Sequence, residues 1–388
     1  MKIAYCIPAL YYPSGMERVL TMKANYLALQ GHEIHIIITD GGDKKPYFPL
    51  EESVKVHQLN IDFEEPYKHF FLYRVWLYLL KMHKLKRALN MCLSHIRPDI
   101  TISLLRRDIN VIDKMKDGSV KIGEIHFDRL HYRYFNALWL PSVINSYIQL
   151  RWMGNLVRKL RKLSKFVVLT YEDLLYWTEL DNVMVIPNPV SFFPERGSDC
   201  RNKQVIAVGR YVEQKGFDRL IPAWRKVIDK HPDWVLKIYG DGWMRYQLQC
   251  CIEELHLSEN CVLEKPVSDI IVKYQESSIF VLSSRFEGMG LVIVEAMACG
   301  LPVVAYACHC GPRDIISEEV DGLLVPEGDI DGLAEAMNRL IEDEELRIKM
   351  GKNARVKAEK YDIDSIGKQW IDLFQSLLKE RENNYELV

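Results

Sequence analysis

The sequence predicts an α/β protein built from two doubly wound parallel-sheet domains. The chain has 388 residues, which is more than one ordinary hydrophobic core supports and suits two domains of common size. Short β-branched runs alternate along it with longer segments of helical periodicity. Some of these runs, such as 34–38, are almost continuously apolar, which is typical of strands buried on both faces of a parallel sheet. The alternation therefore predicts βαβ units.

Strands are expected at regular intervals in both halves of the chain, with helical segments between them. In the first half the expected strands are Lys2–Ile7, Glu33–Ile38, Asp99–Ser103, Val120–Ile125 and Phe166–Leu169. In the second half they are Gln204–Val208, Trp234–Tyr239, Cys261–Leu263, Ile279–Leu282, Pro302–Val304 and Gly322–Val325.

The domain boundary is expected near residue 190. Two prolines in 186–190 and the polar segment 195–202 disfavour continuous secondary structure there. We therefore expect domains at 1–189 and 190–362. The last helical pattern, within 363–388, has no strand after it, and our hypothesis is that it packs back on the first domain.

Composition is that of an ordinary globular protein, with 48% hydrophobic and 27% charged residues. The net charge of −2 hides an asymmetry, because residues 1–190 carry 26 Lys and Arg against 19 Asp and Glu. Much of the positive excess lies in two stretches without any acidic residue, 67–98 and 149–170, which are also rich in large apolar side chains.

The sequence favours a cytoplasmic protein. The nine cysteines include no zinc-type C-x2-C pair, and Cys250–Cys251 and Cys308–Cys310 are too close for ordinary disulfides within each pair, so we expect reduced thiols. The start, 1–12, suits a first strand better than a signal peptide. The most apolar stretch, 70–80, is short for a membrane span and contains Arg74.

The strongest local signal is the run 285–302, RFEGMGLVIVEAMACGLP. It places a glycine-bearing loop between an expected strand and a helix starting near Gly290. Such a turn presents free backbone N–H groups and the positive end of a helix at the carboxyl edge of the sheet, where open α/β sheets bind ligands. Glu287 lies in the loop and Glu295 about a turn inside the helix, so they can serve opposite ends of one ligand.

A pair of cations precedes this run, in the segment Gly209-Arg210 to Lys215-Gly216. Arg210 and Lys215 follow an expected strand and lie at the entry to the next helix. A guanidinium can chelate phosphate oxygens while an ammonium adds a point charge, so the pair suits a diphosphate leaving group. The alternative is a pair of solvated cations at a helix start.

These two motifs resemble those of family 4 of the retaining glycosyltransferases, whose hallmark is a Glu-x7-Glu spacing. The family has the GT-B architecture, two Rossmann-like domains facing across a cleft, and acts in bacterial capsule, lipopolysaccharide and exopolysaccharide synthesis. The resemblance implies a donor site on the C-terminal domain. Its expected residues are Gly209, Arg210, Lys215, Gly240, Gly242, Glu287, Gly288, Met289, Gly290, Leu291 and Glu295.

Within that site the resemblance gives each group a role. Arg210 and Lys215 would clamp the diphosphate. Glu287 and the backbone of 289–291 would meet the sugar hydroxyls, and Glu295 would meet the ribose. Met289 stands where the family often has an aromatic residue, a conservative departure because the contact is made by the backbone.

The first domain carries a weaker resemblance. Gly15 follows the first strand where the family commonly has two glycines facing the donor phosphates, but Met16 replaces the second. The turn lacks G-x-G-x-x-G, which argues against a dinucleotide dehydrogenase. His126 ends a strand where family members often have a histidine near the reaction centre, although a lone histidine is often structural. Arg106 and Arg107 either meet an acceptor phosphate or are simply solvated.

The resemblance implies retention of anomeric configuration by a front-face reaction, with His126, Arg210, Lys215 and Glu287 as the catalytic candidates. Paired carboxylates also occur in glycosidases, but here they accompany a diphosphate clamp. No cofactor or metal is expected, because the two cations can neutralise the diphosphate. The string Asp329-Ile330-Asp331 is interpreted as a helix cap rather than a metal site.

The expected substrates are a nucleotide diphosphate sugar, with UDP favoured by resemblance, and a glycan or polyprenyl-diphosphate-linked glycan. In 149–170, basic residues stand among Trp152, Leu156, Leu160 and Leu163, and such an amphipathic helix could rest on anionic lipid at the inner membrane face. A solvated basic face on a core helix is the alternative. Nucleic acid is not expected, because no recognised binding module accompanies the basic residues.

Two other functions remain open on the sequence alone. A sugar-nucleotide epimerase of the same fold would need no acceptor surface. A silent homologue would bind nucleotide or lipid without catalysis, which the presence of both cations and both glutamates disfavours.

Overall fold

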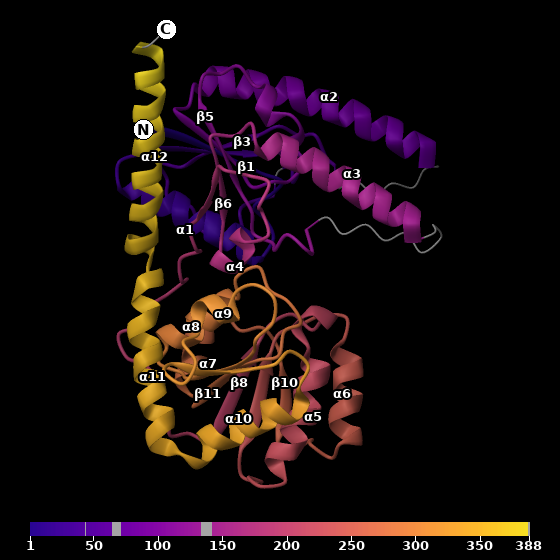
Figure 1. Ribbon diagram of the computed structural model, residues 1–388, viewed down its shortest axis with the longest axis vertical. Helices are drawn as coiled ribbons and strands as arrows, with labels where there is room; N and C mark the ends of the chain where they lie inside the picture. Colours follow the sequence, from indigo (N-terminus) through magenta and orange to yellow (C-terminus); the bar gives the residue numbers. More distant parts are fainter. Residues whose placement is uncertain (43, 64–70, 133–141, 387–388) are drawn as a thin grey trace. The chain divides into compact units, whose positions relative to one another are not determined.

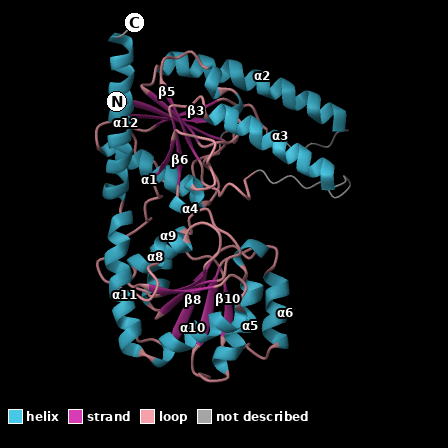
Figure 2. Ribbon diagram, in the orientation of Figure 1, coloured by secondary structure: helices cyan, strands magenta, loops and turns pink. Residues whose placement is uncertain are grey.

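The computed structural model describes residues 1–42, 44–63, 71–132 and 142–386, and the chain divides into two units (Figure 1). Unit 1 comprises Met1–Leu169, Leu174–Ile186 and Ile366–Val388. Unit 2 comprises Thr170–Asp173 and Pro187–Ser365. Each unit is a parallel sheet with helices on both sides (Figure 2), so the predicted fold class is confirmed.

The sheet of unit 1 has seven parallel strands in the order β3-β2-β1-β4-β5-β6-β7. Their bounds are β1 Lys2–Ile7, β2 Glu33–Ile38, β3 Lys55–Gln58, β4 Ile100–Ser103, β5 Val120–Glu124, β6 Lys165–Val168 and β7 Val183–Val185. The sequence missed β3 and β7, the two edge strands. β3 is largely exposed and contains polar residues, and β7 is apolar but only three residues long, so neither stands out as a buried strand in the sequence.

Two hydrophobic clusters cover the two faces of this sheet. The helices are α1 Gly15–Leu29, α2 Phe71–Ile96, α3 Ser142–Leu160 and α12 Ile363–Glu386, with 3₁₀ turns η1 Asp108–Asn110 and η2 Ile112–Lys114. Alternate β1 residues divide between the clusters: Tyr5 packs with α1 and α12, and Cys6 packs with α2 and α3. From Ile366 onward, α12 contributes Trp370 and Phe374 to the first cluster.

The sheet of unit 2 has six parallel strands in the order β10-β9-β8-β11-β12-β13. The strands are β8 Gln204–Val208, β9 Val235–Tyr239, β10 Cys261–Glu264, β11 Ile279–Leu282, β12 Val303–Tyr306 and β13 Gly322–Val325. The helices are α4 Tyr171–Leu174, α5 Phe217–Ile228, α6 Arg245–Glu254, α7 Ile270–Gln275, α8 Leu291–Ala298, α9 Pro312–Ile315, α10 Ile330–Glu342 and α11 Glu344–Ala358, with 3₁₀ turns η3 Glu213–Lys215 and η4 Glu359–Tyr361. All six strands were predicted to within two residues.

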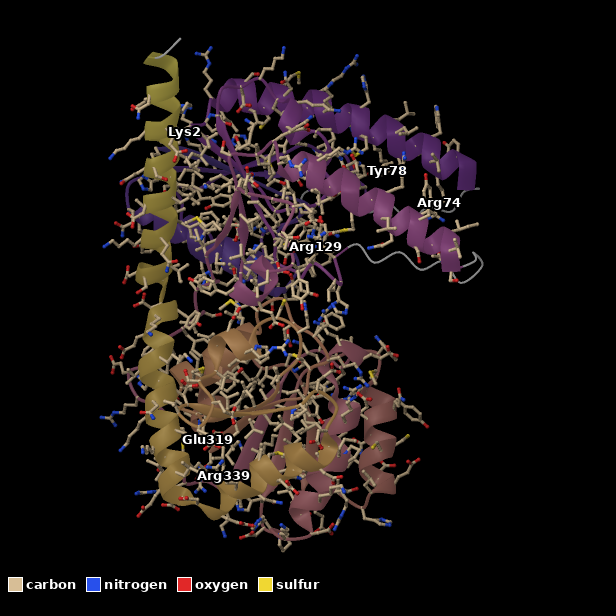
Figure 3. All side chains as sticks on the ribbon, in the orientation of Figure 1. Lys2, Arg74, Tyr78, Arg129, Glu319 and Arg339 are labelled. Carbon is tan, nitrogen blue, oxygen red and sulfur yellow. The ribbon has the colours of Figure 1, made fainter. Side chains whose placement is uncertain are left out.

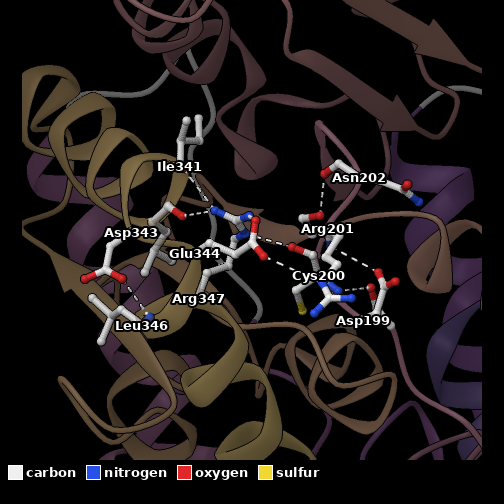
Figure 4. A network of polar contacts seen from close by, with 12 residues as sticks. Asp199, Cys200, Arg201, Asn202, Ile341, Asp343, Glu344, Leu346 and Arg347 are labelled. Atoms are coloured by element: carbon white, nitrogen blue, oxygen red, sulfur yellow. Dashed lines mark hydrogen bonds and ion pairs between the residues drawn. The ribbon is translucent and has the colours of Figure 1, made fainter.

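A buried arginine closes the turn between α10 and α11 (Figure 4). The Arg347 guanidinium donates hydrogen bonds to the carbonyls of Leu340 and Ile341 at the end of α10 and to that of Cys200. The carbonyls of Leu340 and Ile341 lack partners within the last turn of α10, so the guanidinium supplies hydrogen bonds that these buried groups would otherwise lack. Asp343 caps the next helix by accepting a hydrogen bond of 2.8 Å from the Leu346 N–H.

In each sheet the strand order reverses at one place. It reverses between β1 and β4 in unit 1 and between β8 and β11 in unit 2. Loops leaving the carboxyl ends of such neighbouring strands diverge to opposite faces and leave a crevice where ligands bind in open α/β sheets. The loops at these two places are therefore the first candidates for a functional site.

Candidate functional site

The loops after β8 and β11 are fastened together at the switch point of unit 2. The Ser283 hydroxyl donates to the carbonyl of Lys215 at 2.9 Å. The Arg285 N–H donates to the carbonyl of Gln214 at 2.8 Å, and the Gln214 side chain donates in return to the carbonyl of Phe286 at 3.0 Å. The two loops that carry the predicted cations and the first glutamate therefore form one surface.

Glycine is required at two points on this surface because neighbouring backbone lies too close for a side chain. A Cβ on Gly216 would overlap the carbonyl oxygen of Ser283, and one on Gly240 would overlap that of Gly209. Gly216 also has a φ of 64°, in the left-handed region that favours glycine. Gly216 thus allows the loop after β8 to approach the end of β11, and Gly240, one of the predicted site residues, allows the ends of β8 and β9 to approach each other.

Tyr211 supports the loops after β8 and β9 through its buried side chain. Its buried side chain donates from the hydroxyl toward the carbonyls of Ile238 and Glu264, at 2.7 and 2.6 Å. A Cβ on Gly242 would lie 2.5 Å from the Tyr211 carbonyl oxygen. Burial raises the pKa of the Tyr211 hydroxyl, so the group stays a neutral donor. Sequence reasoning did not single out this residue.

Lys215 and Glu287 are in direct contact. The Lys215 ammonium lies 2.6 Å from Glu287 Oε1, and their side chains are only 13% and 7% exposed. The Ser284 hydroxyl donates to the same carboxylate oxygen at 2.6 Å. An ammonium has three N–H donors, so Lys215 can hold Glu287 and still donate to an anionic ligand.

Arg210 differs from Lys215 in its surroundings. It follows Gly209 at the end of β8 and is exposed, and its side chain has no hydrogen-bond or ion-pair partner among the residues that the structure describes. A guanidinium without a counter-ion at the carboxyl edge of a sheet can bind a phosphate by donating two parallel N–H hydrogen bonds.

A second arginine braces the site, and the sequence analysis did not find it. Arg285 forms a bidentate pair with Asp218 on α5, with distances of 2.9 and 2.6 Å. It also donates to the carbonyl of Glu213 at 2.5 Å. The hydrogen bond from Arg285 lowers the pKa of Asp218. The brace fixes the start of α5 and hence the 3₁₀ turn that ends at Lys215.

The loop before α8 is packed against two other segments of unit 2. Gly290 precedes the helix with a φ of 83°. Met289 is buried, and its sulfur accepts a hydrogen bond of 3.2 Å from the Asn188 N–H. A Cβ on Gly311 would overlap the Met289 carbonyl oxygen. The segment 288–291 therefore has a fixed course, with Leu291 as the first helical residue.

Glu295 lies inside α8 and is buried. The Ser191 hydroxyl donates to its Oε1 at 2.7 Å. Glu287 lies in the loop before α8 and Glu295 inside the helix, so the two glutamates occupy separate places along one loop and helix. Such an arrangement suits one extended ligand.

Unit 1 has a cavity of about 530 Å³ at its own switch point. It is lined by residues from the loops after β1, β4 and β5 and from the start of α1: Pro8, Ala9, Tyr12, Met16, Glu17, Leu105, Arg106, Arg107, Phe127, His131 and Tyr132. The Arg106 guanidinium lies 4.9 Å from the centre of the Phe127 ring. Arg107 lies 3.6 Å from the buried carboxylate of Asp40. The cavity therefore combines cations with aromatic faces.

Two predicted site residues belong to unit 1. Gly15 is the first residue of α1, and a Cβ placed there would have nothing within 4 Å, so this glycine is not required by protein packing. His126 follows β5 and is 5% exposed, with Nε2 lying 3.2 Å from Glu124 Oε1. His126 does not line the cavity, although the next residue, Phe127, does.

Glu124 also forms a buried ion pair with Lys23 of α1, which sequence reasoning missed. A signal was present in both segments. Lys23 lies on the buried stripe of α1, between Val19 and Leu27 at helical spacing. Glu124 is the last residue of β5 and is buried, next to the buried Ile125. A charge at a core position of each of two neighbouring elements is the pattern expected of a buried pair.

The Asp329–Asp331 string is confirmed as a helix cap. Asp329 accepts a hydrogen bond of 2.9 Å from the Gly332 N–H at the start of α10. Asp331 pairs instead with Lys226. Within the described residues, no group of three or more metal-ligating side chains occurs.

The basic stretches of unit 1 form α2 and α3, which extend beyond the sheet in Figure 1. The prediction for α3 was wrong in one respect: Leu156, Leu160 and Leu163 are buried in the second cluster and cannot contact lipid. The exposed large apolar residues lie elsewhere, at Tyr73, Val75, Trp76, Tyr78, Leu79 and Leu80 in α2 and at Val143, Ile144, Tyr147, Leu150 and Trp152 in α3. Figure 3 labels Tyr78 of this set and Arg74 on the same helix. No described helix is long and apolar enough to cross a membrane.

A two-unit protein with a cationic strand-end loop beside a glutamate-bearing helix start has the features of a nucleotide-binding transferase, and comparisons with known proteins agree. Residues 191–357 match the family model of glycosyl transferases group 1. An uncharacterized glycosyltransferase of Methanocaldococcus jannaschii is 33% identical over 290 residues, covering 67% of this chain and 68% of that one. The chain therefore belongs to the group 1 glycosyltransferases.

Two further comparisons extend over nearly the whole chain. The Campylobacter jejuni enzyme named GalNAc-alpha-(1->4)-GalNAc-alpha-(1->3)-diNAcBac-PP-undecaprenol alpha-1,4-N-acetyl-D-galactosaminyltransferase is 26% identical over 386 residues, covering 96% of this chain and 98% of that one. A crystal structure of a Staphylococcus aureus TarM mutant in complex with Fondaparinux, alpha-GlcNAc-glycerol and UDP matches with a TM-score of 0.76 at 17% identity, covering 96% and 99%. The fold is GT-B, and the protein is a glycosyltransferase.

Proposed function

We propose that the protein is a retaining glycosyltransferase that moves a hexose or N-acetylhexosamine from a nucleotide diphosphate sugar, with UDP as the nucleotide. The acceptor is a glycan or a polyprenyl-diphosphate-linked glycan in cell-surface polysaccharide synthesis, at the cytoplasmic face of the membrane. One observation at the switch point of unit 2 carries the proposal. The loop after β8 bears Arg210, whose side chain has no partner among the described residues, and Lys215, which contacts Glu287.

Each group at this switch point has a role in donor binding. Arg210 and Lys215 bind the diphosphate, because both cations lie on the loop after β8. Arg210 has no counter-ion among the described residues, and Lys215 keeps N–H donors beyond the one that contacts Glu287. Glu287 and the backbone of 288–291 bind sugar hydroxyls. Glu295, held by Ser191, binds the ribose. Gly209, Gly240 and Gly242 let the β8 and β9 loops pack closely against each other, and these loops support the donor.

Catalysis consists of stabilising the departing nucleotide. The bond from the anomeric carbon to the diphosphate oxygen breaks while the acceptor oxygen bonds to the same face of that carbon. The acceptor proton passes to the departing phosphate oxygen. The charge that grows on this oxygen is stabilised by Arg210 and Lys215, which bind the transition state more strongly than the ground state. The two cations do this without a metal ion.

The acceptor binds to unit 1, and its proposed place is the cavity at the switch point there. Aromatic faces at Tyr12, Phe127 and Tyr132 suit sugar rings, and Arg106 and Arg107 suit a phosphate. The name of the Campylobacter jejuni relative, which describes a glycan on PP-undecaprenol, supports a lipid-linked acceptor. His126, on the same unit, contacts the donor sugar during transfer.

Contact with the membrane accompanies a lipid-linked acceptor. Aromatic and aliphatic side chains of α2 and α3 are exposed together with basic residues that include Arg74 and Arg151. Apolar groups with cations favour the interface of anionic bilayers.

A silent homologue would bind nucleotide without any turnover, and an epimerase would turn over donor at the same rate with or without added lipid extract. The proposed transferase requires the lipid extract.

Turnover of Lys215→Ala tests the proposed function. We expect kcat to fall by about 10²- to 10³-fold, as for loss of one group that stabilises transition-state charge. The matched control is Lys226→Ala. Lys226 is an exposed lysine near the C-terminal end of α5 that pairs with Asp331 of α10, so its loss should leave kcat unchanged. Equal activity of the two variants in a donor-consumption assay with lipid extract would contradict the proposal.

A further inference from the structure

We infer that Glu124 is a positioning residue for His126, and that Lys23, enclosed by Trp370 and Tyr5, holds the Glu124 carboxylate in place. The inference rests on the proposed function, because it takes His126 to act on the donor sugar. It adds to that function a buried ion pair and a residue of the C-terminal helix, neither of which the sequence analysis singled out.

The geometry is a chain of contacts that ends at His126. Glu124 Oε1 accepts a hydrogen bond from the Lys23 ammonium, and the same oxygen lies 3.2 Å from His126 Nε2, which has no hydrogen-bond partner among the described residues. The carboxylate therefore acts on the ring nitrogen through its charge. The three side chains are between 1% and 5% exposed. One carboxylate oxygen thus contacts a fixed cation on one side and the imidazole on the other.

The fold encloses Lys23 on the remaining sides. Its ammonium lies 4.4 Å from the centre of the Trp370 ring and 5.8 Å from that of the Tyr5 ring. Both aromatic residues belong to the cluster that α1 and α12 form on one face of the sheet. Cation–π contacts partly replace the lost hydration of the ammonium, so the C-terminal helix takes part in holding the pair.

The ion pair is better explained by function than by stability. Burying two charges costs several kcal/mol per ion, and apolar residues of similar volume often serve stability as well or better. Glu124 Oε2 has no hydrogen-bond partner within the described residues, which adds to the cost. Burial alone would raise the pKa of Glu124, but the charge of Lys23 brings it to about 2, so the carboxylate is ionised.

An ionised carboxylate 3.2 Å from Nε2 attracts a proton on that nitrogen and so favours the imidazole tautomer that carries its proton there. Nδ1 then remains the nitrogen that can accept a hydrogen bond from a sugar hydroxyl. Without the carboxylate this preference is lost, and so is catalysis that depends on one tautomer.

The test uses a neutral replacement of the pair. Glu124→Gln alone would leave a buried lysine without its counter-ion and could unfold the chain, so the variant is Lys23→Met combined with Glu124→Gln. It is measured in the wild-type background and in a His126→Ala background. We expect the double variant to keep Tm and the donor KM while kcat falls by about tenfold or more.

In the His126→Ala background the same double change should have no further effect on kcat, because residues that act as a unit are not additive. A second readout is the ¹⁵N-histidine NMR spectrum, in which the His126 signal, identified by its loss in His126→Ala, should change tautomer in the double variant. An unchanged kcat, an equal fall in both backgrounds, or an unchanged His126 signal would overturn the inference. Failure of the proposed function would differ, since wild-type protein would then consume no nucleotide sugar, or would consume it at the same rate without lipid extract.

Discussion

Single glycines determine how closely the backbone of unit 2 can pack around the donor site. Gly216, Gly240 and Gly311 each face a carbonyl oxygen of a neighbouring segment, where a Cβ would overlap it. By contrast, a Cβ on Gly154 in α3 would have nothing within 4 Å. Glycines in the same chain are thus required at some positions for packing and not at others.

Gly240→Ala should therefore separate the β8 and β9 loops and impair the donor site. The backbone of Gly209 must move to accept the methyl group, so we expect Tm to fall and nucleotide affinity to fall by at least about tenfold, as overpacking costs roughly 1–3 kcal/mol. The control is Gly154→Ala, which should raise stability by up to about 1 kcal/mol because alanine favours helix.

Gly15→Ala makes a second comparison, because protein atoms leave its side-chain position open. It should keep the wild-type Tm and lower activity if substrate approaches the start of α1. Calorimetry and donor affinity measured on all three variants check these expectations. A Gly240→Ala protein with wild-type affinity would refute the packing argument.

At the scale of elements, the first half of α2 has an unusual surface. Nearly every residue of 73–80 is exposed, including aromatic and aliphatic ones, so this part of the helix does not bury its apolar side chains within the described part of unit 1. Basic side chains occur on the same helix, among them Arg74 (Figure 3). Water is a poor environment for such a helix, and an anionic bilayer surface is a good one.

Replacing two of these side chains should weaken binding to vesicles. Trp76→Ser with Leu79→Ser removes apolar area worth roughly 1.5–3 kcal/mol per side chain if fully buried, so we expect at least about tenfold weaker co-sedimentation with phosphatidylglycerol vesicles. The control is Val356→Ser, which changes a valine on α11 that is about as exposed as Leu79. Binding should also fall as salt rises. Equal binding by wild type and the double variant would exclude this surface as the contact.

At the scale of the whole molecule, the sequence predicts the two sheets well because buried parallel strands are apolar over their whole length. The six strands of unit 2 are mostly apolar, whereas the edge strand β3 is largely polar and exposed and the edge strand β7 has only three residues, and these two were missed. The prediction for α3 misassigned Leu156, Leu160 and Leu163, because amphipathicity alone does not say whether an apolar face meets lipid or the core.

Site residues divide in a similar way. Arg210, Lys215, Glu287 and Glu295 stand in local motifs, so the sequence could propose them. The brace from Arg285 to Asp218 and the pair of Lys23 with Glu124 join residues 67 and 101 positions apart. No local pattern links such partners, and only the folded chain brings them together.

The most direct test of the account is nucleotide binding by the unmodified protein, measured by thermal shift with UDP, GDP and ADP. A ligand at about one hundred times its Kd adds about 2.7 kcal/mol of stability, so we predict that UDP raises the Tm of the wild type and of Lys226→Ala. In the Arg210→Ala, Lys215→Ala double variant the shift should be lost. Absence of any shift with all three nucleotides, or an undiminished shift in the double variant, would contradict the claim that these cations bind the diphosphate of the donor.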